Sequence, residues 1–231
     1  MYPRPSHWRG DPAPPVRPAA LPLICALPVL LSGCLPAPVG PDLGRLSAVP
    51  DAAWQPADLI DRSLLPQSRV LPLPEAIRRA PVGSVIVACQ TTRALWGACT
   101  HLTRKVGAAT LSEETGVIGT GARLRPADSL LERDLILVID AGVREQHLDA
   151  LNAEIRRLSG APYQLNGQLN AFDCSTYQNA LQRAAGLPDA VPLDPRWGAF
   201  LPLGALNVPG HSLLWAGVSD RVTVTPVTPS P

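Results

Sequence analysis

The residues best suited to chemistry are a cysteine at the predicted start of a helix and a histidine that precedes it in the chain. Asp173 is a good N-cap, which places Cys174 at the first position of a helix that continues to about residue 185. Unpaired N–H groups and the helix dipole at such a position favour the thiolate, the nucleophilic form of cysteine. The sequence therefore offers Cys174 as a nucleophile, with a small buried cysteine as the structural alternative.

Four histidines compete for the role of the base that such a nucleophile needs. His101 is the first candidate and His211 the second, because His7 falls in an N-terminal leader and His147 lies on the polar side of a helix. A structural zinc needs four well-spaced ligands, and Cys99 is the only cysteine close to a histidine. We therefore expect no metal site and no other cofactor.

The elements that must position these residues form an α+β pattern. Apolar, β-branched runs predict strands, and amphipathic spacing followed by Gly160 or Gly186 predicts helices. The predicted strands cover residues 81–88 (with an opening turn), 102–110, 115–124 and 135–139, with a polar turn at 112–114, and the predicted helices cover residues 126–133, 144–158 and 173–185.

The segment Phe172-Asp173-Cys174-Ser175-Thr176-Tyr177-Gln178-Asn179-Ala180-Leu181 resembles the nucleophile helix of the NlpC-type papain-like cysteine hydrolases. The order of the parts is similar to the circularly permuted, YiiX-like branch, in which the histidine precedes the cysteine. Those parts are a strand after Gly83-Ser84, then Thr100-His101, further strands, a helix ending in Gly160-Ala161-Pro162-Tyr163, the cysteine helix and a trailing segment at residues 207–214. The resemblance covers roughly residues 81–222 and implies a permuted papain-like fold, a small antiparallel sheet packed with the nucleophile-bearing helix.

The resemblance also implies roles for individual residues. Cys174 would be the nucleophile and His101 the group that takes and returns its proton. Gln168, six residues before Cys174, stands where papain-like proteases keep an amide that helps to bind the oxyanion. Tyr163 corresponds to the tyrosine after the amphipathic helix, which either lines the cleft or packs beneath it.

The third catalytic member departs from the family pattern. Members commonly place a glutamate after an apolar pair, but Gly119 and Thr120 follow Val117-Ile118 here, which leaves Thr120, Glu113 and Glu114 as substitutes. Two functions follow as hypotheses. One is a cysteine hydrolase or acyltransferase acting on an amide or ester, either a cell-wall peptide or an acyl lipid; the other is an inactive envelope lipoprotein that uses the fold as a binding module.

The N-terminus predicts export. Residues 19–31 form an uncharged run that suits a signal-peptide core but is too short for a spanning helix, and it closes in Leu31-Ser32-Gly33-Cys34, which resembles the lipobox of bacterial lipoproteins. We therefore expect a signal peptide over residues 1–33, acylation of Cys34, and anchoring to a membrane of the bacterial cell envelope. An ordinary signal or short anchor with a chance cysteine is the alternative.

Composition sets the remaining expectations. Because 17 of the 27 prolines lie at or before Pro81, residues 34–80 are predicted to form a weakly structured tether ahead of a domain at 81–222 and a loose tail at 223–231. Lys+Arg total 20 against Asp+Glu 19, so no basic stripe for nucleic acid is expected. Cys89 and Cys99 either pair in an oxidising compartment or remain buried thiols.

Overall fold

The computed structural model describes residues 36–116 and 121–227, and its largest element is a seven-stranded sheet. In spatial order the strands are β3 (Val70–Pro72), β9 (Ser212–Val218), β8 (Leu135–Asp140), β4 (Val85–Ala94), β5 (Gly97–Gly107), β6 (Thr110–Glu113) and β7 (Arg123–Pro126). Every neighbouring pair is antiparallel except β3 and β9. The α+β class with a mainly antiparallel sheet is therefore confirmed.

The central strands alternate their side chains between two apolar layers, as the period of two requires. Ile86 and Ala88 point to the layer that contains α2 (Leu73–Arg79) and the 3-10 helix η4 (Ala127–Glu132). Val85 and Val87 point to the opposite layer, which also contains Cys174. The predicted strands at 81–88 and 135–139 thus lie in the buried centre of the sheet as β4 and β8.

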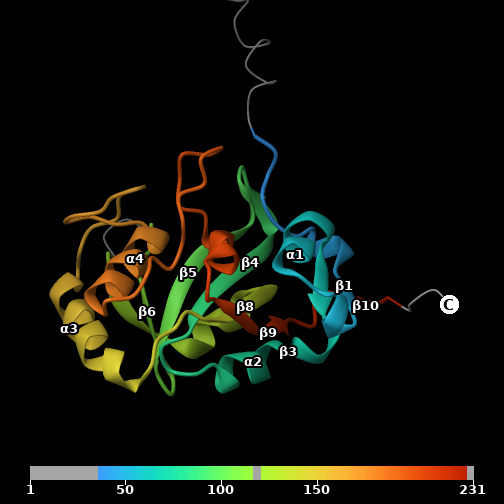
Figure 1. Ribbon diagram of the computed structural model, residues 1–231, viewed down its shortest axis with the longest axis horizontal. Coiled ribbons are helices and arrows are strands. Elements are labelled where there is room, and N and C mark those ends of the chain that lie inside the picture. Colours follow the sequence, from blue (N-terminus) through green and yellow to red (C-terminus); the bar gives the residue numbers. More distant parts are fainter. Residues whose placement is uncertain (1–35, 117–120, 228–231) are drawn as a thin grey trace, which may run out of the picture. The chain divides into compact units, whose positions relative to one another are not determined.

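Two helices follow β8 and pack on each other. The helix α3 (Leu148–Leu158) follows the short 3-10 turn η5 (Glu145–His147), and α4 (Cys174–Ala184) begins where the sequence predicted. The buried faces of α3 and α4 meet through side chains that include Leu151, Ile155, Tyr177 and Leu181. Figure 1 shows both helices at one end of the long strands β4 and β5.

The proline-rich segment is structured, so the predicted tether over residues 34–80 is wrong from Leu43 onward. Its elements are η1 (Leu43–Arg45), β1 (Ser47–Val49), η2 (Asp51–Ala53), α1 (Pro56–Arg62), β2 (Leu64–Pro66), η3 (Gln67–Arg69), β3 and α2. Leu59 and Leu65 are fully buried in the main core. The prolines occupy positions that regular structure tolerates, such as the first turn of α1 and the ends of three-residue strands.

The C-terminal tail is also partly structured, contrary to expectation. The strand β10 (Thr225–Pro226) pairs in parallel with β1, which pairs in parallel with β2, to form a second sheet. The strand boundaries expected between residues 102 and 124 shift as well. Ser112 and Glu113 belong to β6 rather than to a turn, because their polar side chains find buried partners within the fold.

Some expectations fall outside the described residues: the signal peptide at 1–33, the acylated Cys34, the strand start at Val117-Ile118, Thr120 and the tail beyond residue 227. Within the described residues, no helix combines the length and apolar character that crossing a membrane requires.

Candidate active site

Cys174 is the first residue of α4, where it is buried as a free thiol. The Asp173 carboxylate caps this helix, because its Oδ1 accepts hydrogen bonds from the N–H groups of Ser175 at 2.9 Å and Thr176 at 2.8 Å. Its Oδ2 accepts from the N–H of Asn166 at 2.8 Å. The Asp173 carboxylate thus holds the helix start and a neighbouring loop, while Cys174 stays in the field of the helix N-terminus.

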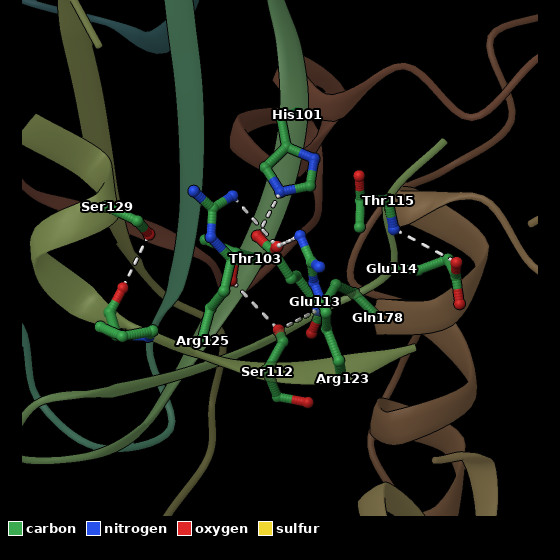
Figure 2. A network of polar contacts seen from close by, with 11 residues as sticks. His101, Thr103, Ser112, Glu113, Glu114, Thr115, Arg123, Arg125, Ser129 and Gln178 are labelled. Atoms are coloured by element: carbon green, nitrogen blue, oxygen red, sulfur yellow. Dashed lines mark hydrogen bonds and ion pairs between the residues drawn. The ribbon is translucent and has the colours of Figure 1, made fainter. Parts of the chain in front are cut away.

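His101 extends from β5 and meets a glutamate from β6. Its Nε2 lies 2.9 Å from Glu113 Oε2, and only 13% of the His101 side chain and 1% of the Glu113 side chain are exposed. The other carboxylate oxygen accepts from Arg125 at 3.2 Å and lies 3.6 Å from an Arg123 nitrogen. Figure 2 shows the Glu113 carboxylate between His101 and these two guanidinium groups. The contact with Glu113 thus engages Nε2 and leaves Nδ1 for another partner.

The neighbours of His101 favour its charged form. Burial alone lowers the pKa of His101, but hydrogen bonding to Cys174 and then to Glu113 raises it to about 9. Burial raises the pKa of Glu113, but the hydrogen bond to His101 and the Arg125 cation outweigh it and keep that pKa below its usual value. A cationic imidazole beside a cysteine stabilises the thiolate. Cys174, His101 and Glu113 are therefore the residue types that could act as a nucleophile, a base and an orienting carboxylate.

Of the three candidates for the third member, Glu113 is the one that the structure brings to His101. Figure 2 shows that Glu114 points to the other side of the chain. Its Oε1 accepts from the N–H of Thr115 at 3.2 Å, and its buried Oε2 has no hydrogen-bond partner. Burial raises the pKa of Glu114 to about 7. Glu114 therefore lacks the contact that an orienting residue needs, and Thr120 lies outside the described residues.

The two residues expected to support the site differ in outcome. Tyr163 lines the cavity that contains Cys174, and burial together with the nearby Cys174 and Asp173 raises its pKa to about 12. Gln168 is exposed and does not line that cavity, so the expected oxyanion amide is absent from this place. The physical reason is the loop at 163–172. Its ends are joined because the Gln164 N–H donates to the Phe172 carbonyl and the Phe172 N–H donates to the Pro162 carbonyl, which places Gln168 toward the loop tip.

The cavity beside Cys174 has a volume of about 200 Å³ and a mainly apolar wall. Its lining residues are Leu95, Trp96, Thr100, Tyr163, Leu165, Asp173, Cys174, Trp197, Ala199, Phe200, Leu201 and Pro202. A larger hollow of about 570 Å³ lies between β3, β9 and η4, but no cysteine or histidine lines it. The cavity next to the thiol is therefore the one suited to the chemistry.

A disulfide joins Cys89 on β4 to Cys99 on β5. These residues are opposite each other in the strand register, and Cys99 is two positions before His101. The bond closes the hairpin whose turn contributes Leu95 and Trp96 to the cavity. Of the two alternatives that the sequence leaves for Cys89 and Cys99, a disulfide or two buried thiols, the structure has the disulfide.

The remaining described histidines have other partners. His147 Nδ1 accepts from the N–H of Arg144 at 3.0 Å. His211 is half-buried, with Nδ1 2.9 Å from the Ala205 carbonyl oxygen, and burial lowers its pKa. Across the described ranges, no group of three or more His, Cys, Asp or Glu side chains is arranged to hold a metal ion.

Sequence reasoning missed the two arginines that flank Glu113. Arg123 lies directly opposite Glu113 in the β6–β7 register and Arg125 lies two residues further, so all three side chains share one face. Residues 123–125 alternate arginine with leucine, which indicates a strand with both arginines on one face. This pattern points to Glu113 only when residues 110–113 are also recognised as a strand.

No family model, curated protein or solved structure matches this chain. The family resemblance thus stays a prediction from the sequence.

Proposed function

We propose that this protein is a cysteine hydrolase or acyltransferase of the permuted papain-like type, which acts on an amide or ester carbonyl at a membrane of the bacterial cell envelope. The observation that carries the proposal is His101, whose Nε2 lies 2.9 Å from Glu113 Oε2 and whose pKa is raised by the neighbouring Cys174 and Glu113. This is the constellation that nucleophilic catalysis by cysteine requires.

The chemistry follows from the protonation of this group. The Cys174 thiolate attacks the carbonyl carbon, forming a carbon–sulfur bond and placing a negative charge on the carbonyl oxygen. The imidazolium of His101 gives its proton to the leaving amine or alcohol as the bond to that group breaks. Neutral His101 then takes a proton from water, whose oxygen attacks the thioester, and the acid and the Cys174 thiolate are released. An alcohol or amine in place of water gives acyl transfer.

The start of α4 supplies stabilisation for the oxyanion. Cys174 is the first helical residue, so its backbone N–H belongs to the group that has no carbonyl partner within the helix. Such N–H groups together with the helix dipole stabilise developing negative charge. The Cys174 N–H is therefore the donor we assign in place of Gln168.

Glu113 favours an enzyme over the inactive binding module. That alternative depended on the lack of a glutamate after Val117-Ile118, and Glu113 supplies the carboxylate from an adjacent strand instead. The Cys89–Cys99 disulfide suits an oxidising compartment and so supports export, as expected for a chain with acylated Cys34.

Hydrolysis of a small soluble ester by the purified full-length protein tests the proposal. We expect Cys174→Ala to abolish turnover and His101→Ala to lower it roughly 100-fold, the usual contribution of a positioned acid–base group. His211→Ala is the matched histidine control and should retain wild-type turnover, because His211 contacts the Ala205 carbonyl rather than the triad. Equal turnover by wild type and Cys174→Ala would refute the assignment.

A further inference from the structure

Exposed apolar side chains surround the cavity that contains Cys174. Leu95 is 67% exposed, Leu165 59% and Tyr163 44%, and all three line the cavity; we call them the apolar rim. Leu169, which is 81% exposed, lies on the same loop as Leu165. Side chains of this size are usually covered when they gather at one place, so the rim indicates a partner surface.

The rim comes from two segments far apart in the sequence, and a third segment adds aromatic side chains. The β4–β5 turn contributes Leu95, the loop at 163–172 contributes Tyr163 and Leu165, and the segment at 194–200 contributes Trp197 to the cavity wall. Asn166 ties two of these segments together by donating from its side chain to the Gly198 carbonyl at 2.9 Å. Figure 1 shows the β4–β5 turn and the orange segment before η6 (Pro202–Asn207) at the same end of the sheet.

The described chain enters the fold beside this rim. The Val39 N–H donates to the Trp96 carbonyl at 2.8 Å, in the turn that bears Leu95. The contact is close because Gly97, with φ +133°, has no side chain: a Cβ there would lie 2.1 Å from the Val39 carbonyl oxygen. Cys34 is five residues before Val39, and five residues extend at most about 18 Å. A lipid on Cys34 would therefore hold Val39, which contacts the β4–β5 turn, within about that distance of the bilayer.

The chemistry of the cavity wall selects the type of ligand. Neither lysine nor arginine is among the described residues that line it, so the described wall offers a carboxylate of a cell-wall peptide no guanidinium or ammonium partner. Asp173 is the one carboxylate among the described lining residues, and its oxygens already accept hydrogen bonds from the start of α4. Trp96, Trp197 and Tyr163 combine an apolar ring with a polar group, the side-chain type that is enriched where protein meets the membrane interface.

We propose that the apolar rim docks on the bilayer that holds Cys34 and that the site takes its substrate, an acyl ester of a membrane lipid, from that bilayer. The cavity of about 200 Å³ is smaller than the roughly 300–1,000 Å³ of sites that enclose a drug-sized ligand. It therefore holds the ester and the first methylenes, while the rest of the acyl chain stays in the lipid. This inference rests on the proposed function and on acylation of Cys34.

Docking is measured with the full-length, membrane-extracted protein in phospholipid vesicles whose acyl chains carry bromine, which quenches nearby tryptophan fluorescence. We expect strong quenching for wild type, and at least a threefold weaker quenching for the double variant Leu95→Asp/Leu165→Asp. Leu131→Asp is the matched control, because Leu131 is 44% exposed but lines the other hollow, and it should be quenched like wild type. Thermal unfolding of each variant establishes that it is folded; if the double variant is unfolded, the single variant Leu95→Asp takes its place.

Measuring turnover as well as quenching distinguishes failure of membrane docking from failure of the proposed function. Wild type should release fatty acid from vesicle phospholipid, and the double variant should do so at least tenfold more slowly. Cys174→Ala should be quenched like wild type but release nothing, because docking does not require the thiol. Equal quenching of wild type and the double variant would overturn the docking surface, and cleavage of soluble cell-wall peptides instead of vesicle phospholipid would overturn the substrate class. If wild type is quenched by the brominated lipid but shows no hydrolysis that depends on Cys174, the proposed function is refuted instead.

Discussion

Glu113 Oε2 lies 2.9 Å from His101 Nε2, and this contact joins two neighbouring strands. Thr103 is directly opposite Glu113 in the register, so His101 is a diagonal neighbour of Glu113 on the same face of the sheet. The pairing of β5 with β6 thus fixes the imidazole, while Cys174 is positioned separately by the start of α4. A substitution at residue 113 should therefore change His101 without displacing the thiol.

Glu113→Gln should lower both the activity and the pKa of His101. Glu113 is one of the groups that raise this pKa to about 9, so its loss brings the pKa down, and the imidazolium is lost at a lower pH than in wild type. We expect turnover at pH 7 to fall about tenfold, less than the roughly 100-fold or more contributed by an acid–base group itself, and the alkaline limb of the pH–rate profile to move to lower pH. The exposed Glu132→Gln is the charge-matched control. An unchanged profile in Glu113→Gln would contradict the orienting role.

Asp173→Ala should destabilise the domain by about 1 kcal/mol, the usual effect of removing an N-cap side chain. For a domain of this size that corresponds to a fall of roughly 2–4 °C in Tm. Asp173→Asn, which keeps one oxygen for the N–H groups of Ser175 and Thr176, should recover most of the loss. Differential scanning calorimetry measures both. Equal losses in the two variants would mean that the charge, rather than the cap, is what stabilises.

The disulfide should contribute about 3 kcal/mol to stability, as expected for a cross-link that closes a short loop. Cys89 and Cys99 are separated by 10 positions and almost fully buried. The double variant Cys89→Ala/Cys99→Ala should have a free energy of unfolding lower than that of wild type by that amount. Its midpoint of urea unfolding should be lower as well. Adding reductant should bring wild type toward the variant and leave the variant unchanged; a wild type insensitive to reductant in the unfolding transition would argue that the bond is not formed.

Glu114→Gln should stabilise the protein at alkaline pH only. Burial raises the pKa of Glu114 from 4.5 to about 7, so its favourable contribution is complete below pH 4.5 and is lost as the pH rises through 7. Glutamine resembles the protonated acid at every pH. The Tm of the variant should therefore match wild type at pH 5 and exceed it at pH 8 by about 3 °C, the effect of roughly 1 kcal/mol. Glu145→Gln, at an exposed position, should show no such difference.

The parts of the site that depend on local sequence were predictable. The start of α4 follows from a capping residue and the spacing of apolar side chains within a single helix, and both are visible in a short window. The sequence leaves Glu113 as one of three candidates, because Ser112 and Glu113 have the composition of a solvent-exposed turn. Their burial depends on distant partners: Ser112 Oγ lies 2.7 Å from the Tyr177 hydroxyl, and Glu113 meets His101 and two arginines.

The proline-rich segment was misjudged for a related reason. Proline density indicates few long helices, but it does not exclude short elements in which each proline sits at a tolerated position. Leu43, Leu46, Leu59 and Leu65 bury their side chains in the core, and β1 pairs with β10 from the far end of the chain. Pairing of this kind between the two ends is not visible in a local pattern.

The hydrogen bond from Val39 to Trp96 has a mechanical consequence. A force that pulls on the chain ahead of Val39 is transmitted through this hydrogen bond to the turn between β4 and β5. The disulfide between Cys89 and Cys99 closes that hairpin. The disulfide lies between that turn and His101, so a pull on the chain ahead of Val39 acts on a covalently closed loop before it reaches the part of β5 that carries His101.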